Sequence, residues 1–545
     1  MSLFGNLYVG NSGLQTSQNA LNTVAHNMVN AETEGYTRQQ VAQVTKSYNT
    51  ISRTNSANAA QQVGLGVSYS EVRQVRDYFL DKSYRKESGR QGFYGVSCDA
   101  IEEVEVIFQE LDGEAFANTL NNLWESVQEL DKDPANTVNQ GIFIQRCAEF
   151  ATRSKAVYKN LEEYQSDLNY QIKQKCDEVN EMGKRIRALN EEILKIESGE
   201  VEHANDLRDE RNNLIDKLST YANISVDTDV DGNYIIQIEG VDFVTVGDVK
   251  TIDLYEDPVT GFYTPYWKQL ASYDSEKNVI PSSVRPARVF NLDMEISTDK
   301  NTDIGSIKSS LLARGDHKAT FMDLEDPTLY DRDIKDSVVM NVMAEFDRLI
   351  HDITTDINEV IMNYADPTTG YLIDSTTGEP FKIFEVSSTE ESQKPEHASD
   401  PDAWKYDYTT NNISINERLK SAPSLLGLKK VDGIVDQECA DALKRVFNSE
   451  THTLNPEVKT KTNLVNFYDN LIAQVSNTGF IMRGISSNQD ITVTNIAASR
   501  EQILGVSSEE ELGNMVMFQN AFNASSRYIN VVSELLEHII NTLGT

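Results

Sequence analysis

The chain has few of the residues on which several classes of protein depend. Its 545 residues include only 4 cysteines, and none forms a Cys-x-x-Cys pair. This spacing fits neither a zinc site nor a small disulfide scaffold, so we expect reduced thiols. No stretch approaches the roughly 18 consecutive apolar residues of a membrane helix. We therefore expect no membrane partner.

Positive charge is also scarce. Lys and Arg number 49 against 85 Asp and Glu, which gives a net charge of −36 and a pI near 4.6. Nucleic acids attract basic surfaces, so we expect no nucleic-acid partner. The acidic residues lie mostly in the middle of the chain, and residues 1–60 are almost uncharged. An uncharged polar end suits packing against protein, because buried unpaired charge is costly.

The usual catalytic and cofactor motifs are missing. The sequence contains no H-E-x-x-H, no G-x-S-x-G, no P-loop and no dinucleotide fingerprint. Asp227, Asp229 and Asp231 begin like a calcium loop, but the twelfth position holds Ile238 instead of Glu. A plain hairpin turn at Asp231-Gly232 explains these residues better. We expect no catalytic residues, no cofactor and no metal site.

One adhesion-like tripeptide, Arg314-Gly315-Asp316, occurs beside a helical apolar pattern that includes Leu311 and Leu312. Recognition of such a tripeptide requires an exposed loop. A position next to a helix does not favour one, so we expect no adhesive role for it.

The strongest positive signal is an apolar heptad repeat at each end of the chain. Near the N-terminus Leu14, Leu21 and Met28 repeat by seven, with Val24 between them. Near the C-terminus a longer row has a and d spacing, with Ser525 as its polar exception. That row consists of Met515, Phe518, Phe522, Ile529, Val532, Leu536, Ile539 and Leu543. Such rows are typical of coiled-coil helices that pack on partner helices, so we predict an assembly subunit and not an enzyme.

The rest of the pattern predicts a mainly α fold with an inserted β domain. Helical periodicity covers residues 12–30, 99–130, 142–220, 304–364 and 437–545. Period-two patterns predict strands over residues 234–238, 241–246, 251–255 and 289–296. Residues 37–80 look extended, and residues 365–436 alternate between short strands and turns.

Helices on both sides of an insertion usually close one bundle, which predicts a nested multidomain layout. We expect a terminal α-helical coiled coil, a bundle of long helices and an outer β-rich domain. The predicted boundaries are 1–60 plus 500–545 for the terminal coiled-coil assembly domain, 61–222 plus 301–364 plus 437–499 for the helical bundle domain, 223–300 for the β-rich domain, and 365–436 for an irregular strand and turn insertion in the helical domain.

Four motifs occur in order along the chain. The N-terminal motif includes Gly13-Leu14-Gln15, His26-Asn27-Met28-Val29-Asn30 and Gly35-Tyr36-Thr37-Arg38-Gln39, and the others lie within residues 204–212, 305–314 and 505–525. Together they resemble the flagellar hook-associated protein 1 family, the hook–filament junction proteins of bacteria. Glu34 departs from the family, which usually has Pro before the Gly-Tyr pair. Residues 223–300 and 365–436 match nothing specific.

The resemblance implies a structural subunit of the flagellum, which forms the hook–filament junction ring on which the filament assembles. It implies four partners: further copies of the chain, the hook protein, the second hook–filament junction protein (hook-associated protein 3), and an export chaperone on the C-terminal helix. The protein would leave the cell through the flagellar type III apparatus without a cleaved signal peptide. An extracellular location in the flagellum differs from the cytosolic one that composition alone predicts.

We expect the assembly sites at both ends of the chain. The C-terminal site is the heptad row given above. The N-terminal helix and turn contribute Leu14, Leu21, Val24, Asn27, Met28, Asn30, Gly35 and Tyr36. Asn30 is expected to end the helix, and Gly35 to supply a positive φ in the turn. Each end alone would be poorly ordered before assembly, since an isolated helix is marginal in water.

Other functions stay open at this point. A flagellin or a hook protein is a related alternative, but flagellins lack the Gly35-Tyr36 type of motif and hook proteins lack the helical run over 142–220. A secreted acidic adhesin or an enzyme with flagellar-like ends is an unrelated alternative. Its activity would lie in the β-rich domain.

Overall fold

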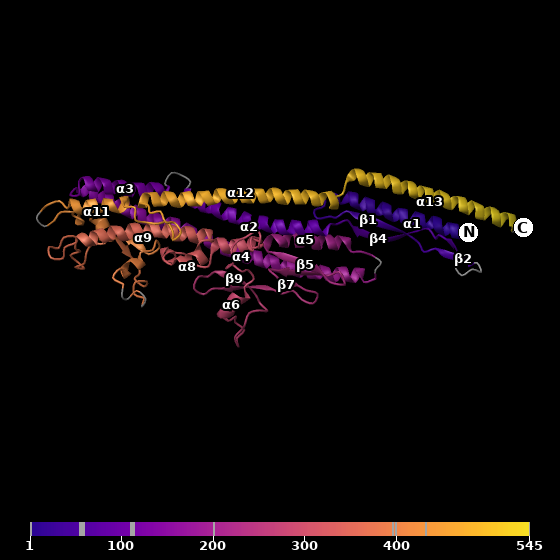
Figure 1. Cartoon of the computed structure of the whole chain (residues 1–545), viewed down its shortest axis with the longest axis horizontal. Helices are drawn as coiled ribbons and strands as arrows, with labels where there is room; N and C mark the ends of the chain where they lie inside the picture. Colours follow the sequence, from indigo (N-terminus) through magenta and orange to yellow (C-terminus); the bar gives the residue numbers. More distant parts are fainter. Residues whose placement is uncertain are drawn as a thin grey trace. The chain divides into compact units, whose positions relative to one another are not determined.

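The computed structural model describes residues 3–53, 60–109, 115–199, 202–394, 397, 400–430 and 433–543 (Figure 1). The chain divides into two compact units. Unit 1 contains Met1–Arg90, Glu178–Thr251 and Gln489–Thr545, and unit 2 contains Gln91–Asp177 and Ile252–Asn488. Long helices dominate both units, and the strands form small separate sheets. This confirms the mainly α multidomain fold. The coiled-coil geometry and the four domain boundaries stay predictions.

Unit 1 is built around two terminal helices, α1 and α13, which lie side by side (Figure 1). They are antiparallel, because Gly10 of α1 lies beside Ile529 of α13, whereas Asn27 contacts Glu511. The helices of this unit are α1 (Leu3–Val29), α5 (Asn205–Tyr221), α13 (Ser508–Leu543), and parts of α2 (Tyr78–Gln109), α4 (Thr137–Glu197) and α12 (Leu464–Leu504). α5 packs antiparallel to the end of α4, where Arg185 binds Glu210.

The strands of unit 1 form nested hairpins and one three-stranded sheet. β1 pairs with β4, and β2 pairs with β3, both antiparallel. β6 lies between β5 and β7. Their bounds are β1 (Gln39–Thr45), β2 (Asn49–Arg53), β3 (Ala60–Val63), β4 (Val67–Gln74), β5 (Ile224–Thr228), β6 (Tyr234–Ile238) and β7 (Val241–Val244). α1 packs on β1 and β4, so the first hairpin covers a side of α1 that α13 leaves free.

Unit 2 combines the remaining helical parts with short irregular elements. Its helices are α3 (Phe116–Lys132), α6 (Pro281–Ala287), α7 (Ser306–Arg314), α8 (Pro327–Leu329), α9 (Val338–Tyr364), α10 (Glu417–Ser421), α11 (Gln437–Asn448), η1 (Phe321–Leu324), η2 (Tyr330–Ile334), η3 (Ala403–Asp407) and η4 (Pro423–Leu425). Its strands form two antiparallel pairs: β8 (Ile252–Glu256) with β9 (Tyr263–Trp267), and β10 (Phe384–Val386) with β11 (Ile413–Ile415).

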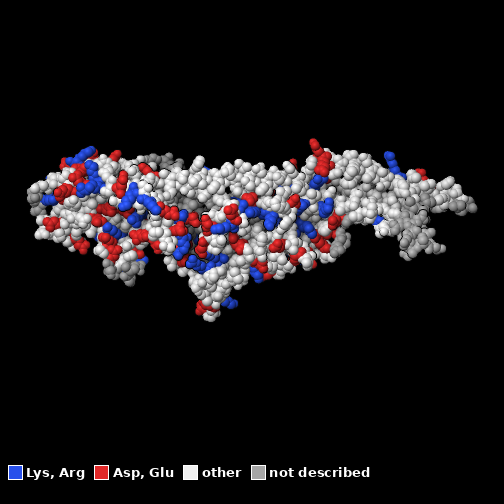
Figure 2. All heavy atoms as spheres, viewed as in Figure 1, with Lys and Arg blue, Asp and Glu red and all other residues white. Residues whose placement is uncertain are grey.

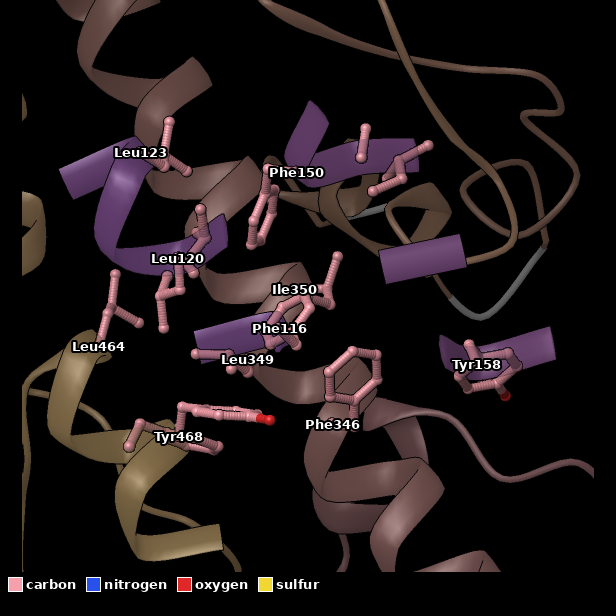
Figure 3. Close-up of a cluster of buried hydrophobic side chains, with 14 of the residues drawn as sticks. Phe116, Leu120, Leu123, Phe150, Tyr158, Phe346, Leu349, Ile350, Leu464 and Tyr468 are labelled. Atoms are coloured by element: carbon pink, nitrogen blue, oxygen red, sulfur yellow. The ribbon is translucent and has the colours of Figure 1, made fainter. Parts of the chain in front are cut away.

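An aromatic cluster forms the centre of the unit 2 core (Figure 3). The ring centroid of Phe116 lies 5.0 Å from that of Phe346 and 5.1 Å from that of Tyr468. These residues come from α3, α9 and α12. Their edge-to-face and tilted contacts are the geometry that aromatic rings prefer. The cluster therefore joins helices that are far apart in the sequence.

Two predictions about local structure in unit 2 are wrong. Residues 289–296 are not a strand, because Asn291 forms a turn in which its Oδ1 accepts the N–H of Asp293. The helix expected over 304–364 is interrupted between α7 and α9. Gly315 ends α7 with a φ of +76°, and a Cβ there would collide with Met340.

The structure shows the surroundings of the two motifs considered above. Asp229 caps the β5–β6 hairpin turn, since its Oδ1 accepts the N–H groups of Asp231 and Asn233 at 2.9 and 2.8 Å. Arg314 of the adhesion-like tripeptide is 3% exposed, so it cannot be presented to a receptor. Within the described ranges, no helix combines the length and the apolar character that crossing a membrane requires.

Candidate assembly site at the paired termini

Two glycines let α1 approach α13 closely. A Cβ atom added at Gly10 would lie 2.7 Å from Cγ1 of Ile529, and one added at Gly13 would lie 2.8 Å from Oγ of Ser525. A side chain at either position would push the helices apart. Ser525, the polar exception in the C-terminal row, is therefore a small residue at a point where α1 and α13 approach each other closely.

The buried row of α1 consists mainly of small residues. Ser17, Ala20, Val24 and Asn27 follow the two glycines at alternating steps of four and three, and all are buried. The larger Leu14, Leu21 and Met28 flank this row and are half-buried. Of the residues predicted on this helix, Val24 and Asn27 lie in the buried row, whereas Leu14, Leu21 and Met28 flank it.

The predicted C-terminal row lies on the α1 side of α13. Val532 is buried, and Met515, Phe518, Phe522, Ile529 and Leu536 are half-buried. Ile539 is exposed, and the side chain of Leu543 lies outside the described residues. Most of this row is thus covered within one chain. Its role in assembly stays a prediction.

Asn27 joins the end of α1 to the first strand. Its Nδ2 donates to the backbone oxygen of Gln39 at 2.8 Å, and its Oδ1 accepts the N–H of Gln39 at 3.0 Å. The hydroxyl of Tyr36 also donates to this Oδ1, at 2.8 Å. The amide thus uses both its donor and its acceptor on the turn, which neither Asp nor Leu could do.

The predicted turn forms between α1 and β1. α1 ends at Val29, and the N–H of Asn30 still bonds to the oxygen of His26 at 3.1 Å. Gly35 has a φ of +77°, the left-handed conformation that glycine adopts freely. Glu34, where the family usually has Pro, is exposed, and the turn forms with it.

An ion pair holds the start of α13 against this turn. The Nε of Arg38 lies 2.9 Å from Oε1 of Glu511, whose side chain is 2% exposed. The guanidinium also contacts the more exposed Glu510 at 3.0 Å. Burial opposes the charge of Arg38, but the two carboxylates outweigh it and raise its pKa. Glu511 also accepts from Nδ2 of Asn27 at 3.3 Å.

The neighbouring Thr37 connects the turn to α5. Its buried N–H donates to Oδ2 of Asp209 at 3.0 Å, and Gln74 of β4 donates to Oδ1 of the same carboxylate at 2.7 Å. Burial raises the pKa of Asp209 to about 6, although Thr37 and Arg76 stabilise the charged form. The N-terminal motif and the motif over 204–212 therefore meet at one carboxylate.

A chain of alternating charges ties α2, α5 and α12 together beside this carboxylate. Arg500 bonds Asp81 at 2.7 Å and Asp216 at 2.6 Å. Arg76 bonds Asp81 through two nitrogens, and Arg85 bonds Asp216 at 2.7 Å. Sequence reasoning missed these residues, because apart from Arg76 and Asp81 the partners are more than 100 residues apart in the chain and form no local pattern.

A second apolar row of α13 remains uncovered in unit 1. Its exposed large members are Met517, Tyr528, Val531 and Leu535. Figure 2 shows few charged side chains on the visible face of the α1–α13 region. A signal existed in the sequence, since Met517, Ala521, Ala524, Tyr528, Val531 and Leu535 alternate in steps of four and three. The site thus has one apolar row facing inward and one facing solvent.

Comparison with known families identifies the fold. Residues 101–378, just over half of the chain, match the family described as flagellar hook-associated protein FlgK helical domain. The chain belongs to the flagellar hook-associated protein family. Residues 7–37 of this family member also match the flagella basal body rod protein family, over the stretch that contains Asn27 and Tyr36.

Curated relatives extend the match over the whole chain. Flagellar hook-associated protein 1 of Bacillus subtilis (strain 168) is 26% identical, covering 100% of this chain and 99% of that protein. The protein of the same name from Escherichia coli (strain K12) is 20% identical, covering 97% and 98%. The solved flagellar hook junction protein FlgK from Burkholderia pseudomallei shares the fold, with a TM-score of 0.54 at 12% identity, covering 79% of this chain and 100% of that one.

This membership confirms the main functional prediction. The chain has a structural role in the flagellum, at the junction of hook and filament. Its family is one of structural flagellar proteins. The flagellar location replaces the cytosolic one that composition alone predicted.

Proposed function

We propose that the chain forms a ring at the hook–filament junction, in which the exposed row of α13 packs on the next subunit. The observation that carries this proposal is the division of α13 into two apolar rows. One row packs on α1 of the same chain, and the other, which contains Val531 and Leu535, is open to solvent.

Ring closure requires a head-to-tail contact between two different surfaces of each subunit. An exposed apolar helix face is one such surface, because burying each large apolar side chain is worth roughly 1.5–3 kcal/mol. The almost uncharged N-terminal segment suits the opposite surface, since burying it leaves few charges without partners. The small residues between α1 and α13 keep these two helices close together in each subunit of the ring.

The pair of Arg38 and Glu511 has a different role in this proposal. It fixes the helix pair to the turn and to α5, so that force on the terminal helices passes into the body of unit 1. Asn27, Tyr36 and Asp209 complete this connection through their hydrogen bonds. Asn27 and Tyr36 of the turn then stabilise the fold of the subunit itself, and the folded subunit forms the ring.

The partners follow from the junction position. The ring would contact the hook protein on one side and the second junction protein, hook-associated protein 3, on the other. Before assembly the exposed row of α13 would favour aggregation, which is a reason for an export chaperone to hold this helix. Export through the flagellar type III apparatus would then deliver the chain without a cleaved signal peptide.

A pair of charge substitutions tests the proposal in cells. Leu535→Asp places a charge in the exposed row, whereas Ser533→Asp adds the same charge at an exposed polar position of the same helix. We expect a strain carrying Leu535→Asp to export the protein but to build hooks without filaments, and the Ser533→Asp strain to build filaments. Normal filaments with both variants would contradict the assignment of this row to the ring.

A further inference from the structure

A cavity of about 310 Å³ in unit 1 concentrates positive charge in this acidic protein. Four arginines and one histidine line it, against a single carboxylate. These residues are Arg73, Arg76, Arg208, Arg211, His203 and Glu71. They come from β4 and the residues just after it, from the first half of α5 and from the segment before α5. Basic residues in this number are unexpected in a chain with a net charge of −36.

Two of the four arginines already have counterions. Arg76 bonds Asp81 through two nitrogens, and Nε of Arg208 bonds Oε1 of Glu197 at 2.8 Å. Each of these guanidiniums is therefore neutralised by a carboxylate. Arg73 and Arg211 form no ion pair with a carboxylate among the described residues.

Arg211 is buried without any carboxylate within ion-pair distance in the described part of the chain. It is 1% exposed, and its Nη1 bonds only neutral oxygens, Oδ1 of Asn190 at 2.8 Å and the backbone of Gly232 at 3.4 Å. Its guanidinium stacks over the ring of Tyr234 at 3.7 Å, and its Nε has no hydrogen-bond acceptor. Burial lowers the pKa of Arg211 to about 10. A buried unpaired charge is costly unless a counterion reaches it.

Arg73 stands at the exposed side of the same cavity. Its one hydrogen bond within the described residues is to Oε1 of Gln40, at 3.4 Å. The cavity thus has an accessible guanidinium at its edge and an uncompensated one in its wall. A guanidinium binds carboxylates and phosphates through paired N–H groups.

We propose that this cavity is an oxyanion-binding site, which takes a group of the size of phosphate, sulfate or a carboxylate. A volume of about 310 Å³ holds such a group with a few waters, at roughly 30 Å³ each. The occupant compensates Arg211 and links β4 to α5. The site lies apart from the exposed row of α13, so this inference does not depend on the ring proposal.

Thermal unfolding of the full chain tests the site. We expect phosphate to raise the melting temperature with saturation, above the effect of sodium chloride at matched ionic strength, because a ligand of the folded state stabilises it by mass action. Comparison with acetate distinguishes an inorganic oxyanion from a carboxylate as the occupant of the cavity. A phosphate effect well above that of acetate identifies an inorganic oxyanion as the preferred occupant, and an acetate effect well above that of phosphate identifies a carboxylate.

Three variants give the decisive comparison. Arg73→Ala should weaken the apparent affinity for phosphate roughly tenfold, the typical loss for one charge-assisted hydrogen bond. Arg211→Met should abolish the phosphate response while raising the melting temperature without anion, because it removes the uncompensated charge. Arg527→Ala, an exposed position on α13, is the control and should keep the full response. Equal responses to chloride and every oxyanion, or an unchanged response in both cavity variants, would overturn the proposal.

Discussion

The guanidinium of Arg38 binds the carboxylate of Glu511, 473 residues further along the chain, with Nε 2.9 Å from Oε1. This pair joins the N-terminal turn to the start of the C-terminal helix. The Glu511 side chain is 2% exposed, and its carboxylate contacts Arg38 and Asn27. The N-terminal motif and the motif within residues 505–525 are therefore connected within one subunit.

Removing one partner of this pair should loosen α13. We expect Arg38→Ala to lower the free energy of unfolding by about 3 kcal/mol, because it leaves a buried carboxylate unpaired. Glu510→Gln is the control, since the Glu510 side chain is 58% exposed and should contribute less than about 1 kcal/mol. Denaturant unfolding measures both. Equal losses in the two variants would show that burial of the pair is unimportant.

Two glycines of α1 give a matched test of the close helix approach. Gly10→Ala should destabilise the chain by about 1–3 kcal/mol, because its Cβ would lie 2.7 Å from Ile529. Gly5→Ala should be neutral or stabilising by up to about 1 kcal/mol, since nothing lies within 4 Å and alanine favours the helix. Melting temperatures compare them. If Gly10→Ala is as stable as Gly5→Ala, the helices do not meet as described.

A charge on the inward row should act differently from one on the outward row. Phe522 shares its row with Ser525 and Ile529, which touch the glycines of α1. Phe522→Asp should therefore separate α13 from α1 and speed amide hydrogen exchange throughout α1. Leu535→Asp should leave exchange in α1 unchanged, because Leu535 is exposed. Equal protection of α1 in both variants would contradict the division into two rows.

Buried Glu345 should make stability depend on pH in unit 2. Burial raises its pKa to about 7, against the donors of Asn455 and Gln474, whereas the unfolded value is near 4.5. The folded state then holds the proton more tightly, so this contribution falls as the pH rises from 4.5 to 7. Melting temperatures at pH 5 and 8 should differ less for Glu345→Gln than for the parent chain. An identical difference would mean that Glu345 does not titrate in this window.

Periodicity predicted the long helices and the side of α13 that packs on α1. It could not identify the centre of the α1 row, because heptad patterns are recognised by large apolar residues, whereas Gly10, Gly13 and Ala20 act through their small size. The second row of α13 carried a readable pattern, but alanines at Ala521 and Ala524 weaken it. Sequence alone cannot say which of two apolar rows a partner covers.

The polar contacts were harder to predict from the sequence than the apolar rows. Asn27 and Tyr36 were predicted from the resemblance, yet their partners depend on how the chain folds back on itself. Arg500 and Asp216 are 284 residues apart, and nothing local marks them as a pair. The predicted strand over 289–296 failed for a related reason: alternation suits a strand, but the turn at Asn291 is the stronger local preference.

The most direct test of the junction role is to delete the gene and examine the flagella. Electron microscopy would score hooks and filaments, and immunoblotting would measure flagellin in the culture medium. We expect hooks without filaments and unpolymerised flagellin in the medium, with both defects reversed by the intact gene. Normal filaments in the deletion strain would contradict a required role at the hook–filament junction.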